Sequence, residues 1–155
     1  MRKKVLFLSS ANGARSQMAE AFLRAFADDG FEAYSAGTTP HDIHPLAVQV
    51  MAERGIDIRG QQVDGLKDFI GTATFDFLIT VCDRDEKACP MYPGKGTREY
   101  WPLTDPGRAG ENDEERLAAF RDARDHIEAR VRRWLVERRY KPAPPAAPED
   151  DGADR

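Results

Sequence analysis

The sequence predicts a single-domain α/β protein, a three-layer sandwich in which a four-stranded parallel sheet has helices on both faces. The apolar run at residues 5–8 is continuous, which is typical of parallel strands covered on both faces, and residues 75–81, FDFLITV, form a second buried strand. Segments in which apolar residues recur with helical spacing alternate with the predicted strands. The length of 155 residues suits one domain with a substantial core.

The first half of the chain supplies two strands and two helices. After the strand at residues 5–8, a helix is expected from Ser16 to the Asp-Asp-Gly sequence near residue 29, because apolar residues there recur every three or four positions. Residues 31–37, FEAYSAG, alternate as a second strand would. The next helix has Pro45 in its first turn and Gly55 as its C-terminal cap.

The second half supplies two more strands and a long helix. We expect a short helix at residues 64–70 and strands at residues 75–81 and 98–103. An apolar stripe predicts a final helix over about residues 111–138, since its members are three, four or seven positions apart. They are Leu117, Phe120, Ile127, Val131 and Trp134. The domain is therefore expected at residues 1–140, and the Pro- and acid-rich residues 141–155 as a disordered tail.

Composition restricts the class of function. The formal net charge is -4 and no basic run with interleaved aromatic residues occurs, which argues against binding to nucleic acid or to a membrane surface. Only four apolar residues follow MRKK, too few for a signal peptide, so we expect a cytoplasmic protein. We also expect a monomer. In that compartment Cys82 and Cys89 are expected to be reactive, metal-binding or buried rather than a structural disulfide.

The loop after the first strand is a candidate oxyanion site. In an open parallel sheet, ligands bind beyond the carboxyl ends of the strands, where this loop is expected. Its backbone N–H groups and the start of the next helix favour negative charge, and the planar guanidinium of Arg15 can hold two oxygens of a tetrahedral anion. The expected anion-binding residues are Ser10, Ala11, Asn12, Gly13, Ala14, Arg15 and Ser16. The alternative is a plain strand–helix connection with Arg15 in solvent.

This loop resembles that of a known family. Ser9, five further residues, Arg15 and Ser16 are similar to the C-x5-R-S loop of low-molecular-weight protein tyrosine phosphatases and of the arsenate reductases that share their fold. The resemblance extends over roughly residues 4–135 and includes YSAGT, FDFLITVCD, CPMYPG and LTDP. The family has a nucleophilic cysteine where this chain has Ser9. A milder departure is Gly13, where family members often have alanine or a small hydroxyl residue.

Replacement of the family's cysteine by Ser9 changes the expected chemistry. A hydroxyl is a far weaker acid than a thiol, no histidine near the loop could act as its base, and a redox exchange requires sulfur. Serine leaves the anion donors in place, so we predict that the chain binds phosphate-like oxyanions without turning them over. Ser9 is either an engineered Cys-to-Ser change, which the survival of the other motifs favours, or the native residue of a pseudoenzyme.

The resemblance also implies roles further along the chain. Asp105, which precedes Pro106, is similar to the family's general acid, although an Asp-Pro turn is the alternative. Gly107 follows, as a small residue does in the arsenate reductases, where phosphatases carry a bulky one. In thioredoxin-coupled arsenate reductases, a first downstream cysteine attacks the loop cysteine and releases arsenite. A second then takes over the disulfide, which thioredoxin reduces; Cys82 and Cys89 match these two thiols.

A bond between Cys82 and Cys89 constrains the segment between them. In a continuous helix the two residues would lie ~10 Å apart, whereas a disulfide needs α-carbons within ~7 Å. The bond therefore requires a looped segment, and we expect residues 83–93 to be mobile. Alternatives are two bystander thiols, or a zinc site completed by His41 and His44.

The resemblance further implies a potassium ion beside the loop. The positions matching its site are Asn12, Glu20, Ser35 and Asp64. The alternative is that these residues hydrogen-bond the loop and one another directly. No other cofactor is expected.

We therefore predict a thioredoxin-coupled arsenate reductase in a form that lacks its attacking thiol. One alternative is a low-molecular-weight protein tyrosine phosphatase, which would use the loop and Asp105 but not the two cysteines. Another is a non-catalytic oxyanion-binding or redox-sensing protein, in which Ser9 is native and only Cys82 and Cys89 react.

Overall fold

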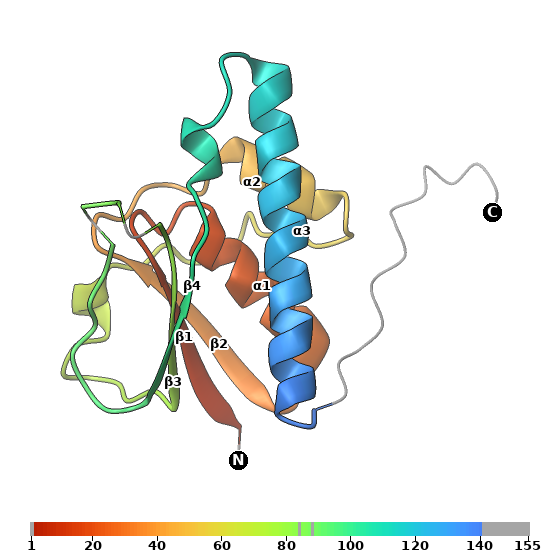
Figure 1. Cartoon of the computed structure of the whole chain (residues 1–155). Helices are drawn as coiled ribbons and strands as arrows, with labels where there is room; N and C mark the ends of the chain where they lie inside the picture. Colours follow the sequence, from red (N-terminus) through yellow and green to blue (C-terminus); the bar gives the residue numbers. More distant parts are fainter. Residues whose placement is uncertain (1, 84, 88, 141–155) are drawn as a thin grey trace.

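The computed structural model describes residues 2–83, 85–87 and 89–140 (Figure 1). Within them four parallel strands form one sheet in the order β2-β1-β3-β4, which confirms the predicted sheet. The strands are β1 (Lys3–Ser9), β2 (Phe31–Gly37), β3 (Phe77–Val81) and β4 (Thr97–Trp101). The helices are α1 (Arg15–Ala27), α2 (Pro45–Ala52), α3 (Asp113–Glu137) and the 3-10 helices η1 (Leu66–Asp68) and η2 (Pro106–Arg108). The predicted tail, residues 141–155, lies outside the described residues.

The two faces of the sheet are covered differently. Val5 and Phe7 of β1 pack into a large core with residues of α1, α2 and α3. Leu6 and Leu8, which point to the opposite face, pack in a smaller cluster with Leu78 and residues around η1. β1 is therefore buried on both faces, as its continuous apolar run predicted. Figure 1 shows η1 on the side of the sheet away from α1 and α3.

The helices begin and end close to their predicted positions. α2 starts at Pro45, and the side chain of His44 caps it by accepting a hydrogen bond from the backbone N–H of Leu46. The predicted helix at residues 64–70 is reduced to the single turn of η1. In α3 the predicted stripe is buried, except for Leu117, which is partly buried. No helix in the described part of the chain is long and apolar enough to cross a membrane.

The parallel sheet brings distant parts of the sequence to one edge. β1 lies between β2 and β3, and Leu8 is paired with Thr80. Ser9, the last residue of β1, and Cys82, the residue after β3, therefore lie at the carboxyl ends of neighbouring strands. β4 runs in the same direction and leads to Asp105, the residue that caps η2. The loop, the cysteines and the predicted acid therefore meet at the edge where ligands of such sheets bind.

Candidate oxyanion site and adjoining disulfide

The loop from Ser9 to Arg15 turns its carbonyl groups outward. The carbonyl oxygens of Ser10, Ala11 and Gly13 accept hydrogen bonds of 2.8–2.9 Å from the backbone N–H groups of Thr39, His41 and His44, and that of Ala14 from Met18. In a trans peptide the N–H of the next residue points opposite to the carbonyl, so the following N–H groups are directed inward. Asn12 has φ of 53°, the left-handed conformation that builds such an anion-binding concavity.

The hydroxyl of Ser9 belongs to a chain of hydrogen bonds that ends at the backbone carbonyl of Asp64. Ser16 Oγ donates to Asn12 Oδ1 at 2.6 Å, and Ser9 Oγ lies 2.6 Å from Ser16 Oγ. Because a hydroxyl has one proton, and Ser16 gives its own to Asn12, Ser9 is the donor to Ser16. The amide of Asn12 in turn donates to the carbonyl of Asp64. The group that accepts the hydrogen bond from Ser9 is therefore another hydroxyl, which is too weak a base to remove the proton.

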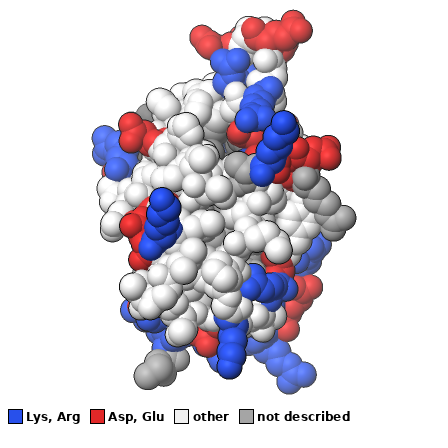
Figure 2. Space-filling view, turned by 90° about the vertical axis from the view of Figure 1, so that its left-hand side faces the viewer, with Lys and Arg blue, Asp and Glu red and all other residues white. Residues whose placement is uncertain are grey.

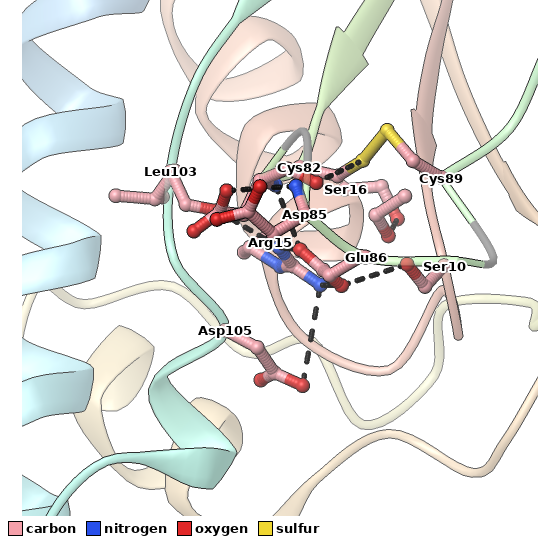
Figure 3. The surroundings of a disulfide bond; sticks show 11 residues. Ser10, Arg15, Ser16, Cys82, Asp85, Glu86, Cys89, Leu103 and Asp105 are labelled. Carbon is pink, nitrogen blue, oxygen red and sulfur yellow. Dashed lines mark hydrogen bonds and ion pairs between the residues drawn. A yellow bond between two sulfur atoms is a disulfide. The ribbon is translucent and has the colours of Figure 1, made fainter.

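Arg15 is buried and its guanidinium grips a carboxylate (Figure 3). Its two terminal nitrogens donate to Glu86 Oε2 and Oε1 at 2.5 and 2.7 Å, and Nη1 also donates to the carbonyl of Leu103 at 2.8 Å. Burial raises the pKa of Glu86, but hydrogen bonds from Arg15, the backbone of Asp83 and Ser10 lower it further, to about 2. Glu86 is therefore a carboxylate at neutral pH, and its pairing with Arg15 was not predicted from the sequence.

A cavity of about 260 Å³ opens at the mouth of the loop. Its lining comprises Ser9, Ala11, Gly13, Ala14, Arg15, His41, Asp42, His44, Asp105, Gly107, Arg108 and Phe120. Asp105 Oδ2 lies 4.0 Å from Arg15 Nη2, while Oδ1 accepts a hydrogen bond from the backbone N–H of Gly107. Asp105 therefore lies on the cavity wall next to Arg15, and it also forms the Asp-Pro turn that was its alternative role.

His44 joins the helix α2 to the cavity. Its Nδ1 accepts the hydrogen bond that caps α2, so the remaining proton of a neutral imidazole is on Nε2. The ring lies 4.6 Å from that of Phe120, and burial lowers its pKa, against an opposing effect of Asp105. Sequence reasoning did not predict that His44 faces this cavity, because its ring partner, Phe120, comes from the distant helix α3.

Cys82 and Cys89 form a disulfide with α-carbons 6.1 Å apart. The segment between them adopts neither helix nor strand at its described residues, as the predicted geometry required. Cys82 is fully buried and Cys89 partly exposed. The described residues contain no group of three or more His, Cys, Asp or Glu side chains that could hold a metal ion, so the zinc alternative has no support. Mobility of residues 83–93 stays a prediction.

The four residues matched to a potassium site form two pairs. Ser35 donates to Glu20 Oε1 at 2.6 Å, and Asn12 donates to the backbone of Asp64 at 3.3 Å. The second oxygen of Glu20 is 2.5 Å from the guanidinium of Arg24. The positive charge that a potassium ion would bring is thus already supplied by Arg24. These residues do not fit a bound ion in this arrangement, and no step proposed below depends on one.

The face turned to the viewer in Figure 2, the left-hand side of Figure 1, carries few clustered charges. Its described Lys and Arg side chains stand apart, and Asp and Glu side chains lie among them around a broad uncharged area. The described part of this face therefore offers no continuous basic surface of the kind that nucleic acid requires.

A four-stranded parallel sheet covered by helices, with the candidate oxyanion loop at its carboxyl edge, is the arrangement expected of a phosphatase-like fold. The sequence profile described as "low molecular weight phosphotyrosine protein phosphatase" matches residues 4–142. The chain belongs to that family.

The relatives within this family include arsenate reductases. The chain is 40% identical over 136 residues to the arsenate reductase of Shouchella clausii (strain KSM-K16), covering 86% of this chain and 96% of that protein. A solved arsenate reductase in its oxidized state superimposes with a TM-score of 0.72, at 32% identity over 87% of this chain and 98% of the other. The thioredoxin-dependent arsenate reductase of Corynebacterium glutamicum gives a TM-score of 0.63 at 31% identity, over 88% of this chain and 61% of that one.

Proposed function

We propose that this protein is a thioredoxin-coupled arsenate reductase in which Ser9 replaces the attacking thiol, so that the chain as it stands binds the oxyanion without reducing it. The observation that carries the proposal is the Cys82–Cys89 disulfide beside the oxyanion loop. A phosphatase mechanism has no use for these two thiols, whereas a reductase needs them to accept the oxidising equivalents of arsenate.

The cavity supports a small oxyanion as substrate. Inward N–H groups, the guanidinium of Arg15 and the carboxyl of Asp105 surround a space of about 260 Å³. The residue after the Asp-Pro pair is Gly107, so this position carries no side chain against which the ring of a phosphotyrosine could stack. The low-molecular-weight tyrosine phosphatase activity considered above is therefore the less favoured alternative.

Each remaining group has a role that its position supports. The loop and Arg15 would hold the tetrahedral anion, and Asp105 would give a proton to the oxygen that leaves arsenic. In a form with cysteine at position 9, Cys82, buried next to the loop, would attack the sulfur bonded to arsenic and release arsenite, forming a disulfide with position 9. The partly exposed Cys89 would then attack Cys82, which frees the thiol at position 9 and leaves the Cys82–Cys89 disulfide for thioredoxin to reduce. We propose that the protein is cytoplasmic, since thioredoxin keeps thiols reduced in that compartment. We also propose that it is monomeric.

Ser9 leaves the first of these steps without a nucleophile. Its hydroxyl donates to Ser16, which is a poor base and cannot remove the proton, and oxygen cannot take part in thiol–disulfide exchange. Binding alone is the activity expected of the chain in this form, whether Ser9 is engineered or native.

The test is arsenate-dependent oxidation of NADPH in the presence of thioredoxin and thioredoxin reductase. We expect no turnover with the unaltered chain, turnover with Ser9→Cys, and its loss when Cys82→Ser or Cys89→Ser is added. Turnover of the unaltered chain would overturn the role assigned to Ser9. A Ser9→Cys variant that hydrolyses a phosphotyrosine analogue but does not reduce arsenate would favour the phosphatase alternative. If it has neither activity, a binding or redox-sensing protein with a native serine is the better description.

A further inference from the structure

The carboxylate of Glu86 is bound in the way a tetrahedral oxyanion would be. Four donors surround its two oxygens: Arg15 Nη1 and Nη2 at 2.5 and 2.7 Å, the hydroxyl of Ser10 at 2.8 Å, and the backbone N–H of Asp83 at 2.7 Å. Figure 3 shows the Glu86 side chain lying between Arg15 and Ser10, with Asp105 on the other side of the guanidinium. Two planar oxygens on a guanidinium fork reproduce the geometry of a bound phosphate or arsenate.

Arg15 cannot hold Glu86 and an external oxyanion in this way at the same time. Both terminal nitrogens are engaged by Glu86, and Nη1 is shared with the carbonyl of Leu103. The side chain of Arg15 is only 4% exposed, so it has little freedom to turn a second face to a ligand. An incoming oxyanion must therefore displace Glu86 before it can receive the bidentate hydrogen bonds.

Glu86 is kept near Arg15 by the disulfide. It lies between Cys82 and Cys89, whose bond closes the segment into a small ring with α-carbons 6.1 Å apart. Two backbone hydrogen bonds support the same turn, from Glu86 N–H to the carbonyl of Asp83 at 3.0 Å and from Cys89 N–H to the carbonyl of Glu86 at 3.2 Å. A tethered group competes at a high effective concentration, which falls when the tether is opened.

We propose that Glu86 is an internal competitor for the oxyanion, which occupies Arg15 while Cys82 and Cys89 are joined and leaves it when they are reduced. Opening the bond takes two electrons and two protons from a dithiol, which becomes a disulfide as the two cysteine thiols form. This inference rests on the proposed function, because it assumes that the loop binds an oxyanion. It adds that the oxidised protein binds new substrate only weakly until its disulfide has been reduced.

The charge of the competitor does not vary under ordinary conditions. Since the pKa of Glu86 is lowered to about 2, its carboxylate is ionised throughout the neutral range. A change of pH near neutrality therefore cannot release Arg15, and the state of the disulfide is the variable that does.

The experiment is isothermal titration calorimetry with inorganic phosphate on the full chain, oxidised and reduced by dithiothreitol, for the unaltered protein and for Glu86→Gln. We expect the oxidised unaltered protein to bind phosphate about ten- to a hundredfold more weakly than its reduced form. Oxidised Glu86→Gln should bind nearly as tightly as reduced protein. Asp85→Asn is the matched control, because it removes a carboxylate from the same segment and should retain the difference between the two redox states.

The outcomes separate the competitor from the binding site. Equal phosphate affinity of the oxidised and reduced unaltered protein would overturn the proposal, and this comparison needs no variant to fold. Oxidised Glu86→Gln that binds as weakly as the oxidised unaltered protein would overturn the role of Glu86. Absence of phosphate binding in every sample, reduced ones included, would overturn the proposed oxyanion site itself and the competitor with it.

Discussion

The hydroxyl of Ser9 is held as a donor to Ser16, and this arrangement explains what a sulfur atom would change. Ser16 now gives its proton to Asn12 Oδ1. With a thiolate at position 9, the same hydroxyl could turn to donate to sulfur, and the inward N–H groups of the loop would stabilise the negative charge. The surroundings of Ser9 are therefore suited to an anion that serine itself does not form.

Glu86 should also make stability depend on acid. A carboxylate whose folded pKa is lowered, here from 4.5 to about 2, stabilises the fold above its unfolded pKa, and this contribution is lost as pH falls through the folded value. We expect the oxidised unaltered protein to lose about 2 kcal/mol more of its unfolding free energy between about pH 6 and pH 3 than Glu86→Gln does. Urea unfolding across this range measures it. Parallel pH profiles for the two proteins would contradict the pairing with Arg15, and Asp85→Asn again serves as the control for charge.

At the scale of elements, buried or partly buried carboxylates join strands to helices. Glu99 of β4 accepts hydrogen bonds from Trp134 Nε1 at 2.7 Å and from Arg138 at 2.5 Å, both at the end of α3. Glu20 of α1 similarly joins Ser35 of β2 and Arg24 of its own helix. The pKa of Glu20 is raised on balance, because burial outweighs the lowering by Ser35 and Arg24, and the charge of Arg24 opposes this rise by favouring the ionised form.

The Glu20–Arg24 pair predicts how the protein responds to potassium. With Arg24 present, we expect the same melting temperature in KCl and NaCl at equal ionic strength. Arg24→Gln leaves the carboxylate of Glu20 without its cation, so KCl should then stabilise the variant over NaCl by about 1 kcal/mol, or roughly 3 °C. Differential scanning fluorimetry measures this shift. The matched control is Arg59→Gln, because exposed Arg59 pairs with its neighbour Asp57. A potassium preference of the unaltered protein would instead support the ion implied by the family resemblance.

At the scale of the whole molecule, the features that could be predicted are those that depend on residues close together in the sequence. The strands and long helices follow from the spacing of apolar residues, and the candidate site positions Arg15, Cys82 and Asp105 from motifs that follow strand ends. Glu86 was missed because its partner Arg15 is 71 residues away and nothing local marks the contact. A carboxylate between two cysteines that form a ring near a buried arginine could have been the signal, but only once the strand order was known.

Gly37 is a second position whose importance comes from the assembled sheet. It ends β2 and lies against the loop after β1, where an added Cβ would be 2.7 Å from the backbone nitrogen of Asn12 and 2.8 Å from the carbonyl carbon of Ala11. Backbone atoms at such distances must move apart. Since the N–H of Asn12 is one of the inward groups of the loop, a side chain at position 37 would disturb the oxyanion site as well as the packing.

We therefore expect Gly37→Ala to lower the free energy of unfolding by about 2 kcal/mol and to weaken phosphate binding of the reduced protein about tenfold or more. Gly60→Ala is the matched control, because an added Cβ there meets nothing within 4 Å. It should leave phosphate affinity unchanged and stability within about 0.5 kcal/mol. Urea unfolding and calorimetry on both variants measure the two effects. A Gly37→Ala protein with unaltered stability and affinity would show that the loop can shift away from β2 at no loss, and that its N–H groups are not held in place by the end of this strand.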